Sequence, residues 1–95
     1  MNEQILTLNP DPNKKGVKVD KAHYDFVRAE ILKAIKKEGP LASMQLVDVM
    51  IRRLGKDKTF GKSIGWYTMA VHLDLESKGE LLYDRKAKKP VLSLP

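Results

Sequence analysis

The sequence predicts a mainly α-helical domain in which three helices form the core and a small β-hairpin follows them. Three stretches repeat apolar residues at spacings of three and four, and they end at Gly39, Gly55 and Gly79. Two short apolar runs near the C-terminus flank the basic turn "KAKKP", as the strands of a hairpin would. The chain has 95 residues, 42% of them hydrophobic and 32% charged, so it can bury one core.

The first 19 residues are predicted to form an extended N-terminal arm, ahead of a domain that spans residues 20–95. Pro10 and Pro12 remove amide donors and force the residues before them toward extended geometry. The arm also carries an apolar cluster that consists of Ile5, Leu6 and Leu8. A disordered tail would not need such a cluster, so we expect another part of the molecule to cover it.

The first helix is expected to run from Asp20 to about Glu38. Asp20 can cap the amides of the first turn, and Val19 and Tyr24 occupy the two positions of a hydrophobic staple. An apolar stripe follows at helical spacing and consists of Tyr24, Val27, Ile31 and Ile35. The sequence Gly39–Pro40 ends the helix.

The second helix is expected over residues 43–54, and the third over residues 63 to about 78, with Ser43 and Ser63 as caps. Placing the third helix at 100° per residue gives it two apolar faces. The inner face consists of Ile64, Thr68, Val71 and Leu75. The outer face consists of Trp66, Met69, Ala70 and Leu73. Only one of these faces can pack on the first two helices.

The C-terminal hairpin is expected to pair residues 80–85 antiparallel with residues 91–94. Pro90 stands near the start of the second strand, where its missing amide donor matters least. Three helices followed by a hairpin with a basic tip is the element order of a winged helix-turn-helix domain.

Two segments carry a resemblance to that fold class. "GPLASMQLVDVMIRRL" and "LDLESKGELLYD" resemble the second helix and the end of the third helix of winged helix-turn-helix domains. The combination of "LNPDPNKKGVKVD", "GWYTMAVHLDLESKG" and a short hairpin is similar to a family of small uncharacterised bacterial winged-helix proteins. The resemblance implies the fold, a three-helix core plus a C-terminal wing, and no activity.

The first functional hypothesis is a DNA-associated, transcription-regulator-like module that uses the third helix and the basic hairpin. The net charge of +6 favours polyanions. Basic side chains flank the third helix and could bind the phosphates of double-stranded DNA. They are Lys56, Lys58, Lys62, Arg85, Lys86, Lys88 and Lys89. Against base reading, the outer face offers Trp66 and Met69 where a reading helix usually offers Arg, Lys, Asn or Gln.

The second hypothesis is a protein-interaction or homo-oligomerisation module without DNA binding. In it, Trp66, Met69 and Leu73 contact another protein or a second copy of the chain. A third interpretation places Trp66 in the core, with the helical phase wrong by one position. If the outer face is real, we expect the apolar cluster of the arm or another chain to cover it.

Several other classes are excluded by the residue pattern, so we expect a protein that is not an enzyme and needs no cofactor, metal or small-molecule substrate. The segment "GKDKTFGKS" is one residue longer than a Walker A loop and follows a helix where that loop needs a strand. There is no cysteine, and neither His23 nor His72, the latter expected to be partly exposed, has a second ligand at metal spacing. No apolar run approaches membrane length, and the start lacks a secretory pattern. We expect a cytoplasmic protein.

Overall fold

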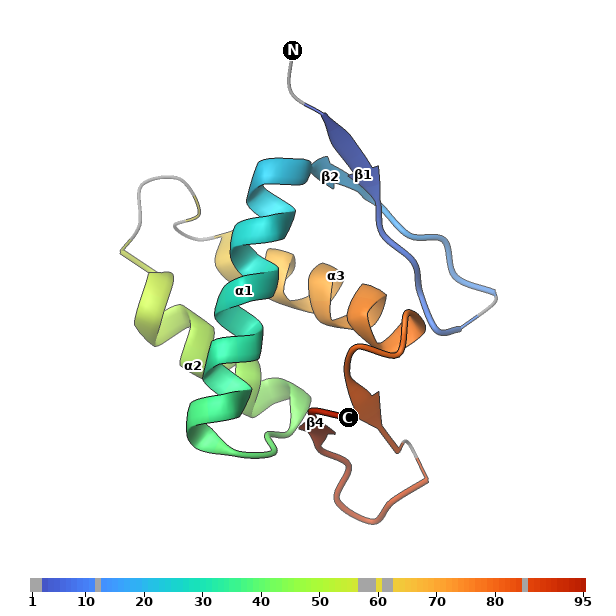
Figure 1. Cartoon of the computed structure of the whole chain (residues 1–95), viewed down its shortest axis with the longest axis vertical. Helices are drawn as coiled ribbons and strands as arrows, with labels where there is room; N and C mark the ends of the chain where they lie inside the picture. Colours follow the sequence, from blue (N-terminus) through green and yellow to red (C-terminus); the bar gives the residue numbers. More distant parts are fainter. Residues whose placement is uncertain (1–2, 12, 57–59, 61–62, 85) are drawn as a thin grey trace.

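The fold is that of a computed structural model, which describes residues 3–11, 13–56, 60, 63–84 and 86–95. These residues form three α-helices and two short β-hairpins (Figure 1). The elements in chain order are β1 (Gln4–Leu6), β2 (Lys18–Asp20), α1 (Lys21–Glu38), α2 (Ser43–Leu54), α3 (Ile64–Ser77), β3 (Leu82–Tyr83) and β4 (Leu92–Ser93). The predicted class, mainly α-helical with a small C-terminal hairpin, is confirmed.

The ends of α1 follow from the residues that the sequence places there. The Asp20 carboxylate accepts hydrogen bonds from the Ala22 and His23 amides, 2.9 and 3.4 Å away. Gly39 ends the helix with a φ of 84°, a conformation that favours glycine, and its amide donates to the Ile35 carbonyl.

The start of α2 differs from the expectation. Ala42, and not Ser43, is the N-cap residue, and Ser43 is already helical. The Ala42 amide donates to Gln45 Oε1 at 2.9 Å, so a side chain from inside the first turn holds this end. Ser63 does stand at the N-cap of α3, although its side chain makes no capping hydrogen bond.

The core lies where the three helices meet. The inner face of α3 is fully buried there, together with the stripe of α1 and with Leu46 and Met50 of α2. Burying a large apolar side chain stabilises the fold by about 1.5–3 kcal/mol, so this face fixes the orientation of α3. The outer face therefore lies on the side of α3 that is turned away from this core.

Two hairpins flank α3 in Figure 1, where the arm runs beside the helix and the C-terminal hairpin lies below it. β1 and β2 pair antiparallel with Ile5 opposite Val19, so residues 1–19 include a hairpin, and β2 continues to Asp20. β3 and β4 pair over two residues each, a shorter ladder than expected. Leu41 also forms an isolated antiparallel bridge with Leu92, which ties the segment before α2 to β4.

Candidate binding groove between the arm and helix α3

The outer face of α3 is only partly covered. Trp66 is 51% exposed and Met69 40% exposed, while Ala70 and Leu73 are half-buried. The prediction of two apolar faces is thus confirmed, and the interpretation that places Trp66 in the core is wrong. The predicted helical phase holds because the inner face is the one that is buried with residues of α1 and α2 in the core.

The arm and the outer face of α3 enclose a groove of about 180 Å³. The outer face forms one wall with all four of its side chains. The arm forms the other wall with Thr7, Leu8, Asn9, Lys15, Gly16 and Val17. The expected cover by the apolar cluster is therefore incomplete. Leu8 lines the groove, Ile5 packs against the core, and Leu6 remains exposed.

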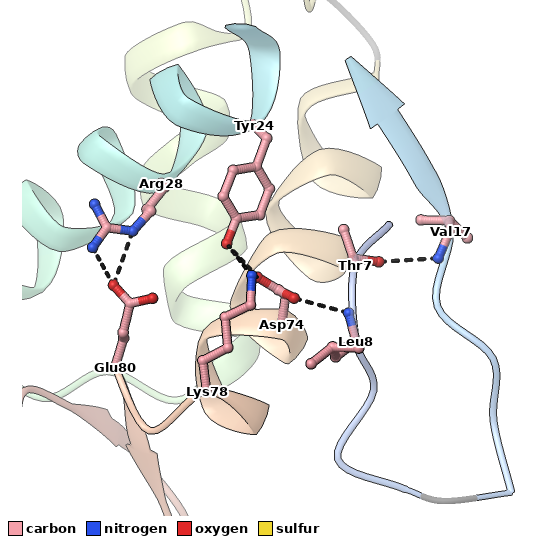
Figure 2. Close-up of polar contacts among 8 residues, drawn as sticks. All are labelled: Thr7, Leu8, Val17, Tyr24, Arg28, Asp74, Lys78 and Glu80. Carbon is pink, nitrogen blue, oxygen red and sulfur yellow. Dashed lines mark hydrogen bonds and ion pairs between the residues drawn. The ribbon is translucent and has the colours of Figure 1, made fainter. Parts of the chain in front are cut away.

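A buried carboxylate fixes the arm against α3 (Figure 2). Asp74 is 0% exposed, and its Oδ1 accepts a hydrogen bond from the Leu8 amide at 2.8 Å. Its Oδ2 accepts from the Tyr24 hydroxyl of α1 and lies 2.9 Å from Lys78 Nζ. One side chain of α3 thus joins the arm, α1 and the next turn of its own helix.

The arm closes on itself across Thr7 and Val17, as Figure 2 shows for their polar contact. The Thr7 amide donates to the Val17 carbonyl at 2.8 Å, and the Val17 amide donates to Thr7 Oγ1 at 3.0 Å. Next to this contact, a Cβ atom at Gly16 would lie 1.5 Å from the Thr7 carbonyl oxygen. The two sides of the arm can approach this closely only because residue 16 is a glycine.

Aromatic contacts hold Trp66 at one end of the groove. Its ring meets the Tyr67 ring edge-on, with centroids 5.1 Å apart, and Tyr67 meets Phe60 in the same way at 5.3 Å. Such edge-to-face pairs add about 0.5–1.5 kcal/mol each beyond burial. The half-exposed indole is therefore packed in a defined place on its inner side.

The expectation that His72 is partly exposed is wrong, since this residue is 3% exposed. The first turn of α2 packs over it, and His72 Nε2 lies 3.2 Å from Ser43 Oγ. On its other side, Nδ1 lies 3.4 Å from Glu76 Oε2. Met69 Sδ lies 3.3 Å from the same Nε2, within α3, and 3.7 Å from Ser43 Oγ of α2, so contacts within and between the helices support the Met69 side chain at the groove.

The pH dependence of stability is predicted from Tyr24. Two causes raise the pKa of the Tyr24 hydroxyl well above the ordinary value of 10.0. The larger is its burial, and the second is its hydrogen bond to Asp74. The protonated phenol is then favoured in the folded chain, so its stabilisation is complete below the unfolded pKa and is lost as the pH rises above about 10.

We expect the free energy of unfolding, measured by urea titration, to fall between about pH 8 and about pH 11 by more in the wild type than in Tyr24→Phe. Tyr24→Phe lacks the hydroxyl and keeps every other ionisable side chain, so the difference between the two proteins isolates the contribution of Tyr24. Equal losses in the two proteins would contradict the assigned role of Tyr24.

The basic residues predicted for phosphate binding are only partly placed. Lys86, Lys88 and Lys89 are exposed in the turn of the C-terminal hairpin, and Lys56 is exposed after α2. The Lys86 amide donates to Asp84 Oδ1 at 3.0 Å, which shapes that turn. The remaining predicted basic residues, Lys58, Lys62 and Arg85, lie outside the described residues. In the predicted protein-contact set, Trp66, Met69 and Leu73 do come together on one wall of the groove.

Sequence reasoning placed the Leu8 segment of the arm beside the outer face as one of two alternatives, but it missed the contribution of residues 15–17 to the groove and the role of Asp74. Two signals could have found them. Asp74 is three residues after Val71 and one before Leu75, so a carboxylate there falls beside the inner face and needs buried partners. Gly16 interrupts an extended segment, which indicates a close approach of another backbone.

The described part of the chain holds no group of three or more His, Cys, Asp or Glu side chains arranged to bind a metal ion. Among the same residues, no helix combines the length and the apolar character needed to cross a membrane.

Comparison with known proteins assigns the chain to a sequence family. Neither the curated proteins nor the solved structures include a match to it. A family profile, described as "Family of unknown function (DUF6958)", matches residues 4–92. The match begins at β1, includes every residue that lines the groove and ends in β4. Since it covers nearly the entire chain, the protein belongs to this Family of unknown function (DUF6958).

Proposed function

We propose that the protein is a protein-interaction module that binds a segment of another protein in the groove. The observation that carries the proposal is the pair of large apolar side chains, Trp66 and Met69, half-exposed on one wall of a defined hollow. Leu8 and Val17 are exposed on the opposite wall. Contiguous exposed apolar surface of this kind marks interaction sites in soluble proteins, and Trp is enriched among the residues that contribute most to binding.

Both walls of the groove are fixed before a partner arrives. The Asp74 carboxylate holds the arm at Leu8, and the Tyr67 ring holds one side of Trp66. A preformed site loses less conformational entropy on binding, so more of the apolar burial contributes to affinity. Each large side chain that becomes fully buried contributes about 1.5–3 kcal/mol.

The charge of the arm favours a different protein over a second copy of the chain. Three exposed lysines, Lys14, Lys15 and Lys18, lie on the arm that forms one wall. A twofold dimer through this face would place two such positively charged arms in one interface, and like charges across an interface cost affinity. The net charge of +6 also opposes self-association, because two copies of the chain repel each other.

The test is selection of linear peptides from a random display library, followed by affinity measurement on purified variants. We expect Met69→Ala to weaken binding of the selected peptides by about tenfold or more, because the truncation removes a large apolar contact from the groove without adding a charge. Ile51→Ala is the matched control, since Ile51 is an exposed apolar residue of α2 that does not line the groove. Failure to select any peptide, or equal losses in both variants, would contradict the proposal.

A second candidate function is a DNA-associated module of the winged helix-turn-helix type. Support comes from the order of three helices and a hairpin, from the bridge between Leu41 and Leu92, and from the exposed lysines in the hairpin turn. Because the arm stands beside the outer face of α3, such a module would bind through phosphates and not through base edges.

For this second candidate, replacing Lys86, Lys88 and Lys89 with alanine is expected to weaken binding to unrelated duplexes alike. Each lost phosphate contact should reduce the log-log salt slope of the binding constant by roughly 0.9. The slope is measured by titrating salt in a fluorescence-anisotropy assay. As a control, alanine at Lys33, Lys36 and Lys37 of α1 removes the same charge elsewhere. An unchanged slope in the hairpin variant would remove the hairpin from the interface.

A further inference from the structure

We propose that the segment bound in the groove is acidic, with an Asp or Glu side chain that pairs with Lys15 beside an apolar side chain that enters the groove. This inference rests on the proposed function and specifies the chemistry of the partner. It is carried by the hydrogen-bonding groups that the groove presents and by the charges around it.

The polar lining of the groove is rich in donors. Thr7 Oγ1 already accepts the Val17 amide, and Asn9 Oδ1 already accepts the Asp11 amide at 2.9 Å. The Asn9 side chain also carries an NH₂ group with two donors, and Lys15 carries an ammonium group with three. A carboxylate accepts hydrogen bonds and cannot donate them, so it matches both groups.

The charges near the groove point the same way. Among the lining residues in the described part of the chain, Lys15 is the one charged residue. Lys14 and Lys18 add positive charge on the same arm. Asp74, the carboxylate that holds the arm, is buried with its three partners. Over residues 7–18 of the arm, three lysines stand against one carboxylate, Asp11, and three minus one leaves a net charge of +2. A partner segment with negative charge therefore meets a rim of net positive charge.

The apolar wall of the groove suits an apolar side chain next to the carboxylate. This wall, the outer face of α3, carries no charge, and Lys15 stands on the opposite wall. A segment that alternates acidic and large apolar residues would satisfy both walls at once. A basic segment of the same apolar pattern would bring like charges together at Lys15.

The experiment compares peptide selection on three proteins: the wild type, Lys14→Glu/Lys15→Glu and Lys88→Glu/Lys89→Glu. The last variant is the matched control, because it reverses two adjacent exposed lysines in the C-terminal hairpin, away from the arm. We expect the wild type and the control to enrich Asp and Glu beside large apolar residues, and the arm variant to enrich Lys and Arg. An acidic peptide selected on the wild type should bind the arm variant about tenfold more weakly and the control almost unchanged.

The outcomes separate this inference from the proposed function. Peptides that depend on Met69 but show no acidic enrichment, or whose preference is the same on the arm variant, would overturn the inference and leave the groove as a binding site. Selection of no peptide by any of the three proteins would overturn both. Equal weakening in the arm variant and the control would show an effect of net charge and would likewise overturn the inference.

Discussion

Replacing Asp74 with alanine is expected to lower the free energy of unfolding by about 3–5 kcal/mol, as breaking a buried charged network does elsewhere. The substitution leaves the Tyr24 hydroxyl and the Leu8 amide without their acceptor, and Lys78 without its ion-pair partner. Small domains have a net stability of about 5–15 kcal/mol, so the loss is a large part of the total. Urea unfolding followed by Trp66 fluorescence measures it.

The control for this substitution is Asp48→Ala. Asp48 is an exposed carboxylate on α2, and its removal should change stability by no more than about 0.5 kcal/mol. Hydrogen exchange gives a second readout, because the Leu8 amide should be protected in the wild type and exchange quickly in Asp74→Ala. A loss below about 1 kcal/mol, the size expected for a single ordinary hydrogen bond, would contradict the role of Asp74 as the point where the arm is held.

Replacing Gly16 with alanine is expected to open the arm. The new Cβ would lie 1.5 Å from the Thr7 carbonyl oxygen, and a backbone atom cannot rotate away as a flexible side chain can. The two sides of the arm must separate, which breaks the hydrogen bonds between Thr7 and Val17 and removes one wall of the groove. Overpacking of this kind costs about 1–3 kcal/mol, and a contact between backbones belongs at the upper end of that range.

The same substitution at Gly65 is the control for Gly16→Ala. A Cβ there would meet only Val47 Cγ1 at 3.7 Å, an ordinary contact, and Gly65 is the second residue of α3. Alanine in a helix is favoured over glycine, so Gly65→Ala should stabilise the fold, by less than the roughly 0.5–1 kcal/mol typical of a helix interior. The two variants should therefore differ in sign by urea unfolding, and peptides selected on the wild type should lose affinity for Gly16→Ala alone. Equal effects at the two glycines would contradict the close approach at Gly16.

Much of the helical fold follows from local sequence signals. The Asp20 cap, the stop at Gly39 and the inner face of α3 could be predicted because each depends on residues within one or two turns. The sequence favours Ser43 as the cap of α2 because serine is a better capping residue than alanine. In the structure the helix begins at Ser43 and the cap is the residue before it, Ala42, whose amide is satisfied by the Gln45 side chain.

The groove depends on contacts between residues far apart in the chain, and these could not be derived from periodicity. Leu8 and Asp74 are separated by 66 positions, and nothing local to either one indicates the hydrogen bond between them. His72 was expected to be partly exposed because its position on α3 lies between the two apolar faces. The first turn of α2 covers it, a packing that depends on the angle between two helices.

The central claim, that the groove between the arm and α3 is the binding site, is tested most directly by mapping amide chemical shifts with a selected peptide bound. We predict that the shifted resonances fall on the two walls, at residues 7–9, 15–17 and 66–73, and include the indole N–H of Trp66. This indole is a single reporter because the chain has one tryptophan. Shifts confined to Lys86–Lys89 and the rest of the C-terminal hairpin, with the Trp66 indole unchanged, would contradict the claim.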